Sequence, residues 1–286
     1  MKIYFIRSLS LFLALLFSLA LFTSCAKKPE LTSDTREMEE SGSAGETQTD
    51  SNIVKLTFPE GYSISRIALK LEENGVCGAQ EFRDETNKTE YLTEYGFDIP
   101  NPADRAFLLE GYLFPDTYEF LIGENPSSVL KKFLDNTKSK LTSEIKSRAS
   151  QLGYSVDEII TLASIVQRES GGSDEAKRVS SVIHNRLDSP SFPKLQCDAT
   201  ISYLKESIKP YIDDGDVYYT YCENYNTYMC KGLPAGAINN PGMAAINAAL
   251  YPEDTPYYYF VTDSEGVYHY SESWEEHSGK VSQAGL

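Results

Sequence analysis

Residues 155–170 carry the local pattern that most limits the fold of this chain. Ser155 can accept a hydrogen bond from the backbone amide of Glu158 while the Glu158 carboxylate reaches back, and this capping box starts a helix. The apolar residues that follow form one broad arc of that helix, namely Ile159, Leu162, Ala163, Ile165 and Val166. Gly171 and Gly172 end it. The chain must therefore build a core against one face of this helix.

Glu169 lies at the end of the apolar arc, beside Ile165 and Val166, whereas Arg168 points to the opposite side. Desolvation by the aliphatic neighbours and the negative end of the helix dipole both predict a raised pKa for the Glu169 carboxyl. A carboxylic acid that stays protonated at neutral pH can protonate the leaving oxygen of a glycosidic bond. The pattern alone also allows a salt bridge or a cap on a neighbouring helix, which is the commoner role of a glutamate at a helix end.

The rest of the chain from Ile53 onward mixes strand and helix patterns. IVKLTF predicts a strand, and Ser63 predicts the cap of a helix that ends at Gly75. Further helices are predicted over residues 79–95 and 127–152, and the turn sequence DSEG predicts a late antiparallel hairpin. We therefore expect an α+β fold, in which a small strand-helix module is followed by a mixed region of helices and antiparallel strands.

Residues 1–25 have the pattern of a signal peptide. Their apolar run is shorter than the roughly 20 residues that a membrane-spanning helix needs, and the small residues before Cys25 are typical of a lipoprotein processing site. Phe22 stands where such sites usually hold leucine, so an uncleaved membrane anchor is the alternative. Residues 26–52 are polar and predict a disordered tether. We expect a lipid on Cys25, or an anchor, to hold the protein at the cell membrane with its folded part on the extracytoplasmic side.

The charge of the chain limits its partners. There are 42 Asp and Glu residues against 26 Lys and Arg residues, which gives a formal net charge of -16. Such an excess of acid, without a basic cluster, argues against nucleic acid and against an anionic membrane surface as partners. A neutral polymer or a small substrate fits this charge better.

Four cysteines follow Cys25 in the sequence, namely Cys77, Cys197, Cys222 and Cys230. Their state has two alternatives. Outside the cytosol they could form two disulfides, for which three pairings exist, or they could remain free thiols. A metal site is not expected, because no C-x-x-C pair occurs and the three histidines show no ligand spacing. Of these, His269 lies on the second strand of the predicted hairpin, where a packed histidine is the simpler interpretation.

Several longer segments of the sequence are similar to those of a known protein family. These segments are LEGYLFPDTYEF, ASIVQRE, VSSVIHNRL, LQCDATISY, YNTYMCKGLPAGAINNPG and YYYFVTDSEGVYHYSESWEEH. Their residues and their order resemble the endolytic murein transglycosylase (YceG-like) family over residues 53–277. The resemblance implies an abbreviated LysM-like module at residues 53–98 and a transglycosylase catalytic domain at residues 99–286. Most of the family has a transmembrane anchor and a longer LysM-like region, and this chain departs from both patterns.

The resemblance also implies site residues. Glu169 matches the catalytic acid of the family, and Gln167 replaces an earlier acidic residue of the same motif. The implied substrate-binding residues are Gln196, Asp198, Asn226, Tyr228, Gly232 and Pro234. Taken without the resemblance, Asp198 is equally well explained as a helix cap before ATISYL, and Asn226 as a turn residue.

The function implied by the resemblance is lytic cleavage of peptidoglycan between MurNAc and GlcNAc, without metal or organic cofactor, which leaves 1,6-anhydroMurNAc ends within nascent strands. One alternative is a muramidase-type hydrolase, which would need a second carboxylate from Asp198 or Glu175. Another is a catalytically silent lipoprotein that binds the cell wall. Peptidoglycan strands are the expected partner, together with proteins of cell-wall synthesis or division.

Overall fold

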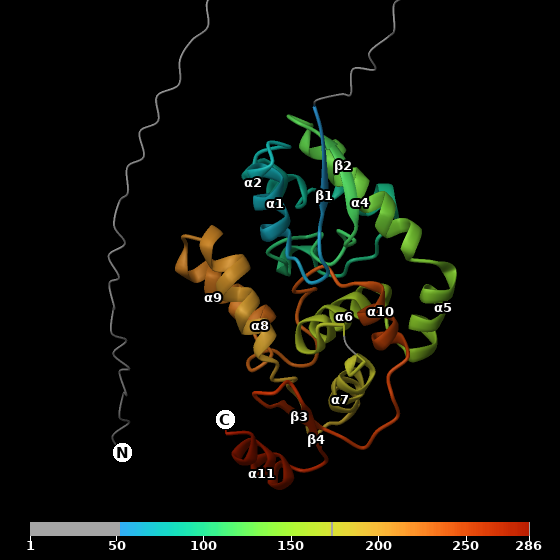
Figure 1. Cartoon of the computed structure of the whole chain (residues 1–286), viewed down its shortest axis with the longest axis vertical. Helices are drawn as coiled ribbons and strands as arrows, with labels where there is room; N and C mark the ends of the chain where they lie inside the picture. Colours follow the sequence, from blue (N-terminus) through green and yellow to red (C-terminus); the bar gives the residue numbers. More distant parts are fainter. Residues whose placement is uncertain (1–51, 173, 286) are drawn as a thin grey trace, which may run out of the picture. The chain divides into compact units, whose positions relative to one another are not determined.

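The computed structural model describes residues 52–172 and 174–285 (Figure 1). Helices make up most of this part of the chain, and its strands form two separate antiparallel pairs. This content agrees in broad terms with the predicted α+β class. The predicted signal peptide with Cys25 and all but the last residue of the predicted tether lie outside the described residues. Nowhere in the described ranges is a helix both long and apolar enough to cross a membrane.

The first strand pair brings together segments that are far apart in the sequence. The elements up to residue 152 are β1 (Ile53–Thr57), α1 (Ile64–Glu73), α2 (Ala79–Glu85), α3 (Glu90–Tyr95), β2 (Thr117–Leu121), α4 (Pro126–Lys140) and α5 (Ser143–Leu152). β1 runs antiparallel to β2, with Ile53 opposite Leu121. The predicted first strand and the Ser63 cap of α1 are confirmed. The strand pair joins residues 53–98 to the region that follows them, and the LysM-like character of residues 53–98 stays a prediction.

Two helices that were predicted as continuous are each divided in the structure. The helix predicted over residues 79–95 is α2 followed by α3, and between them the Asn87 side chain accepts a hydrogen bond from the amide of Leu108 at 2.7 Å. The helix predicted over residues 127–152 is α4 followed by α5, because the Thr142 side chain caps a new helix. The apolar periodicity gave no sign of this second break, since residues on both sides of it are buried in the same core.

The remaining elements surround a central helix, and they are α6 (Val156–Ser170), α7 (Ala176–Asp188), α8 (Asp198–Tyr203), α9 (Gly215–Tyr225), α10 (Met243–Leu250), β3 (Tyr259–Thr262), β4 (Tyr268–Ser271) and α11 (Trp274–Ala284). The central helix is α6, which packs against α5, α7, α8 and α10. Its predicted capping box between Ser155 and Glu158 is present, and Gly171 ends it in a left-handed conformation, φ 60°. The start and the end of this helix were therefore predicted correctly.

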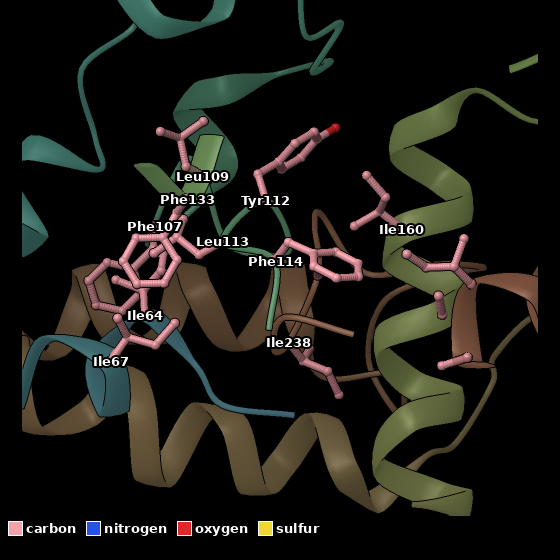
Figure 2. Packing of buried hydrophobic residues seen from close by; sticks show 14 of the residues in the cluster. Ile64, Ile67, Phe107, Leu109, Tyr112, Leu113, Phe114, Phe133, Ile160 and Ile238 are labelled. Carbon is pink, nitrogen blue, oxygen red and sulfur yellow. The ribbon is translucent and has the colours of Figure 1, made fainter. Parts of the chain in front are cut away.

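The segment 107–114 connects α6 with the N-terminal elements, as Figure 2 shows. Its apolar side chains pack toward Ile64 of α1 on one side and toward Ile160 of α6 on the other (Figure 2). Gly111 has φ +93°, and a Cβ atom there would lie 2.6 Å from Ile160 Cγ2 and 2.6 Å from Ala237 Cβ. Only glycine permits this approach, because the backbone conformation and the space both exclude a side chain. The segment thereby fixes α6 against the rest of the core.

The C-terminal hairpin and α11 complete the described part of the chain. β3 and β4 pair antiparallel across the predicted turn, with Tyr259 opposite Ser271. The Asp263 carboxylate stabilises this turn by accepting the amides of Glu265 and Val267 at 2.9 Å each. α11 packs on both strands, and β3 also contacts α7. The predicted hairpin is confirmed, and β3 places it beside α7.

The four cysteines of the described region are free thiols in the structure, and they are Cys77, Cys197, Cys222 and Cys230. Of the two alternatives that the sequence left open, the structure has the unpaired one. Burial raises the pKa of the Cys77 thiol to about 11, and nearby glutamates add to this rise. At neutral pH this thiol is protonated and is a poor nucleophile.

Candidate active site

Glu169 lies in the last turn of α6, one residue before the helix ends. Burial is the main cause that raises the pKa of its carboxyl, and the nearby Asp198 carboxylate adds to this rise. Two interactions act in the opposite direction and lower this pKa. The backbone amide of Ala199 donates a hydrogen bond to the Glu169 carboxyl, and the charge of Arg168 stabilises the carboxylate. The predicted direction of the shift is confirmed, and its main cause is desolvation. A larger fraction of Glu169 is therefore protonated at neutral pH than for an exposed glutamate.

A cavity of about 530 Å³ opens beside Glu169. Its walls come from the last turn of α6, one face of α7, the loop before α8 and the first residue of α8, the segment after α9, the hairpin and α11. The lining residues are Glu169, Val182, Ile183, Arg186, Leu195, Gln196, Cys197, Asp198, Tyr228, Tyr258, Tyr259, Phe260, Val261, Trp274 and His277. A cavity of this size, whose wall combines aliphatic and aromatic side chains with polar groups, is typical of a ligand site.

Three of the predicted substrate-binding residues line this cavity together, and they are Gln196, Asp198 and Tyr228. The Tyr228 hydroxyl donates a hydrogen bond to Asp198 Oδ1 at 2.8 Å. Gln196 has φ 57°, a left-handed conformation that non-glycine residues rarely adopt. Thr227 holds this strained loop, because its carbonyl accepts the amide of Gln196 and its hydroxyl accepts the amide of Cys197, at 3.1 and 2.8 Å. Such strain is common where a side chain is aimed into a functional site.

The other three predicted substrate-binding residues do not line this cavity. Asn226 Oδ1 accepts the amide of Tyr228 at 2.9 Å, so the side chain shapes the turn that presents Tyr228. Gly232 and Pro234 line a different cavity, of about 440 Å³, together with Tyr154 and other residues. The structure therefore separates the GLPAGAI loop from the Glu169 cavity. Substrate contact by Asn226, Gly232 and Pro234 stays a prediction.

Arg186 is a cavity residue that the sequence analysis did not single out. Its guanidinium is buried and donates to the carbonyl of Tyr258 at 2.7 Å and to the carbonyl of Leu195 at 2.6 Å. It also lies over the rings of Phe192 and Tyr259, 5.1 and 5.0 Å from their centroids. The helical spacing from Val182 and Ile183 would have placed it on the same face of α7. Arg186 thus ties α7 to the hairpin and to the strained loop.

The aromatic residues contributed by the hairpin and α11 were also missed. Tyr259, Trp274 and His277 line the cavity with Glu169, although about a hundred residues separate them from it in the sequence. His269 stays outside the cavity, where its ring bonds Asp263 at 2.8 Å across the turn. No periodicity along the chain predicts such a long-range meeting, since it depends on how the hairpin packs on α7.

The geometry suits general acid catalysis. The cavity holds one half-buried carboxyl with a raised pKa and a second carboxylate, Asp198, that is bonded to Tyr228. The Tyr268 hydroxyl donates to the backbone carbonyl of Glu169 at 2.7 Å and so fixes the end of α6 against the hairpin. A proton donor held in this way can act on an oxygen of a bound ligand.

Comparison with known proteins gives consistent matches. The sequence profile of the YceG-like family matches residues 34–283. Proteins named endolytic murein transglycosylase are 28% identical to this chain, over 232 residues in Bacillus subtilis and over 253 residues in Streptococcus pneumoniae. These matches cover 78% and 81% of this chain, but only 63% and 44% of the two relatives. The chain therefore spans less than two thirds of the length of these curated relatives.

A solved structure is also similar. The crystal structure of a yceG-like protein from Listeria monocytogenes superposes with a TM-score of 0.67 and is 27% identical in sequence. The match covers 79% of this chain and 75% of that protein. The similarity in fold therefore extends over most of the described residues.

Proposed function

This chain belongs to the YceG-like family, and from that premise we propose that it is a lytic transglycosylase acting on peptidoglycan. The observation that carries this proposal is the position of Glu169, a carboxyl whose pKa is raised mainly by burial, at a cavity of about 530 Å³. The name of the relatives, endolytic murein transglycosylase, supports the same substrate and reaction. Cleavage within glycan strands, rather than at their ends, is part of the proposal and rests on that name.

The proposed reaction needs one acid. Glu169 donates its proton to the oxygen between MurNAc C1 and GlcNAc, and the bond from C1 to that oxygen breaks. The Glu169 carboxylate then removes the proton from the C6 hydroxyl of the same MurNAc, whose oxygen bonds to C1. The products are a free GlcNAc hydroxyl and a 1,6-anhydroMurNAc end, and no water is consumed. Glu169 regains its proton, so the acid is ready for a second turnover.

The polar residues of the cavity have proposed roles in binding. Burial is the main cause of the raised pKa of Glu169, and the Asp198 charge adds to it. Asp198 can also accept hydrogen bonds from sugar hydroxyls on the oxygen that Tyr228 does not use. The Gln196 side chain offers both a donor and an acceptor to an acetamido group. We propose both as substrate-binding residues.

A hydrolase is the second candidate, because Asp198 is a carboxylate in the same cavity as Glu169. In an inverting or retaining hydrolase a second carboxylate activates water or forms a covalent intermediate. Glu175 does not line the cavity, since its carboxylate bonds Arg178 and the Tyr270 hydroxyl. Of the two carboxylates considered for a hydrolase, only Asp198 therefore lies in the cavity where it could activate water or form a covalent intermediate.

The products decide between the two reactions. Purified peptidoglycan digested with the protein is expected to yield fragments that end in 1,6-anhydroMurNAc, as measured by mass spectrometry. These ends are lighter by one water than the reducing ends that a hydrolase leaves. Reducing ends as the main product would establish the hydrolase instead. Binding of glycan without any new ends would favour a catalytically silent cell-wall protein.

We predict that Asp198→Asn shifts the pH dependence of cleavage. The Asp198 charge raises the pKa of Glu169, so its removal lowers that pKa. Cleavage requires protonated Glu169, so kcat/KM falls as the pH rises through this pKa, and the variant should lose activity at a lower pH than the wild type. The measurement is kcat/KM against pH, with Glu175→Gln as a charge-matched control. An unshifted profile would contradict the proposed coupling, and a loss of about 100-fold or more at every pH would favour the hydrolase.

The surroundings of the reaction are also proposals. We propose that the N-terminus holds the protein at the cell membrane, through a lipid on Cys25 or an uncleaved anchor, with the folded part on the extracytoplasmic side. Residues 53–98 would then serve as a LysM-like module that binds glycan or supports the catalytic region. Proteins of cell-wall synthesis or division are proposed partners there.

A further inference from the structure

One part of the cavity has no role in the reaction described above. Three aromatic side chains from the end of the chain, Tyr259, Trp274 and His277, line the Glu169 cavity, and we call them the aromatic wall. The Tyr259 ring lies 6.0 Å from the Trp274 ring and 5.1 Å from the His277 ring, and the last two lie 5.6 Å apart. The three rings therefore form one continuous group at the cavity.

Trp274 is the exposed member of this wall. It is the only tryptophan of the chain, and 66% of its surface is exposed. The Ser273 side chain accepts the amide of Glu276 at 3.2 Å and starts α11, so Trp274 is held at the first position of a capped helix. The Lys280 ammonium donates to the carbonyl of Tyr270 and ties α11 to the hairpin. A large apolar ring is thus presented to solvent by a supported backbone.

We propose that the aromatic wall is a carbohydrate subsite, on which an acetamido sugar ring of the glycan strand stacks against Trp274. This inference rests on the proposed function, because it extends the same cavity beyond the bond that Glu169 protonates. A pyranose ring presents a face of C–H groups, which packs on a flat aromatic ring, while its hydroxyls remain in water. The exposed ring would lose its contact with water when the sugar binds.

The charges favour a sugar ring over the peptide stem as the occupant. Burial lowers the pKa of His277, so the wall is uncharged at neutral pH. The same cavity contains the acid Asp198, and the chain carries a formal net charge of -16. The Arg186 guanidinium donates to two backbone carbonyls and lies over the Tyr259 ring. The carboxylates of a peptide stem would be repelled by Asp198 and by the excess negative charge of the chain, whereas a GlcNAc ring, which carries no carboxylate, would not.

The single tryptophan makes the test direct. The full-length Glu169→Gln protein, in which cleavage is expected to be at least about 100-fold slower, is titrated with peptide-free glycan strands while tryptophan emission is recorded. We expect a saturable change with a shift to shorter wavelength, because a bound sugar removes water from the indole. Free stem peptide is the second titrant, and it should produce no change.

Two substitutions in the active full-length protein complete the test. Trp274→Ala should raise KM for peptide-free glycan strands about 5- to 10-fold with little change in kcat, whereas Trp274→Phe should stay within about 2-fold of the wild type. Tyr251→Ala is the matched control, because Tyr251 is 41% exposed and lies outside the cavity, and it should leave KM unchanged. The exposure of Trp274 makes a folding defect unexpected, and circular dichroism checks this.

Several outcomes would overturn the subsite. The first is that Glu169→Gln does not bind peptide-free glycan, or binds it by calorimetry without a change in tryptophan emission. The second is that free stem peptide changes this emission as much as glycan does. The third is that Trp274→Ala leaves KM unchanged. The proposed reaction fails separately. If the wild type forms anhydro ends while Trp274→Ala behaves as the wild type, the subsite is wrong and the reaction stands. If the wild type forms no anhydro ends while Trp274 responds to glycan, the reaction is wrong and the subsite stands.

Discussion

Glu169→Gln is expected to lower the rate of glycan cleavage by at least about 100-fold, which is the usual contribution of a positioned general acid. Glutamine has the same shape and can still accept the amide hydrogen of Ala199, but it has no proton to donate. The free energy of unfolding should change little, because a neutral amide at this half-buried position avoids the desolvation that raises the Glu169 pKa. The measurement is the initial rate of appearance of new glycan ends from purified peptidoglycan.

The matched control is Glu158→Gln, at the other end of the same helix. Glu158 belongs to the capping box of α6, and glutamine can replace glutamate in that motif. We therefore expect Glu158→Gln to cleave glycan at the wild-type rate. If Glu169→Gln retained more than about a tenth of the wild-type rate, or if both variants lost activity equally, Glu169 would not be the acid.

The part of the site that was predictable is the part that local chemistry determines. The capping box and the apolar arc placed Glu169 on a helix and on its buried side, because both depend only on residues within a few turns of each other. The desolvation that raises the pKa of Glu169 follows from that placement. Gln196, Asp198 and Tyr228 came from the resemblance, and the structure brings all three to the cavity of Glu169.

What could not be predicted depends on contacts between distant segments. The aromatic wall reaches the cavity only because β3 packs on α7 and α11 packs on the hairpin, and its residues follow Glu169 by about a hundred positions. The GLPAGAI loop shows the opposite case, since it is close in sequence to Tyr228 but Gly232 and Pro234 line another cavity. Nearness along the chain was a poor guide in both cases.

The break between α4 and α5 has a local cause that periodicity hides. The Thr142 side chain accepts the amide of Ile145 and starts a new helix, which is an ordinary capping pattern. Leu141 and Ile145 are nonetheless buried in the common core, so the apolar spacing continues across the break. A search for capping residues inside a long periodic segment would have found the boundary.

Asp157→Ala is expected to lower the free energy of unfolding by about 3 to 5 kcal/mol, which is typical when one partner of a buried ion pair is removed. Asp157 lies in the first turn of α6 and pairs with Arg105, and their side chains are 4% and 1% exposed. The Tyr112 hydroxyl also donates to Asp157, at 2.9 Å. Among the described residues, Nε and Nη1 of Arg105 are buried without a hydrogen-bond partner. Without Asp157, the guanidinium would keep its charge in the core with no anion beside it.

The control for this substitution is the exposed pair of Lys55 and Glu119, which lie 3.5 Å apart with side chains that are 68% and 63% exposed. Glu119→Ala removes the same charge but should cost at most about 1 kcal/mol, because water solvates the lysine that remains. The double variant Arg105→Ala with Asp157→Ala should lose less free energy of unfolding than the sum of the losses of the two single variants. Each single variant leaves the charge of the other residue buried without its partner, and the double variant does not. Denaturant unfolding of all four variants measures these differences. Equal losses for Asp157→Ala and Glu119→Ala would mean that the buried pair does not hold the start of α6.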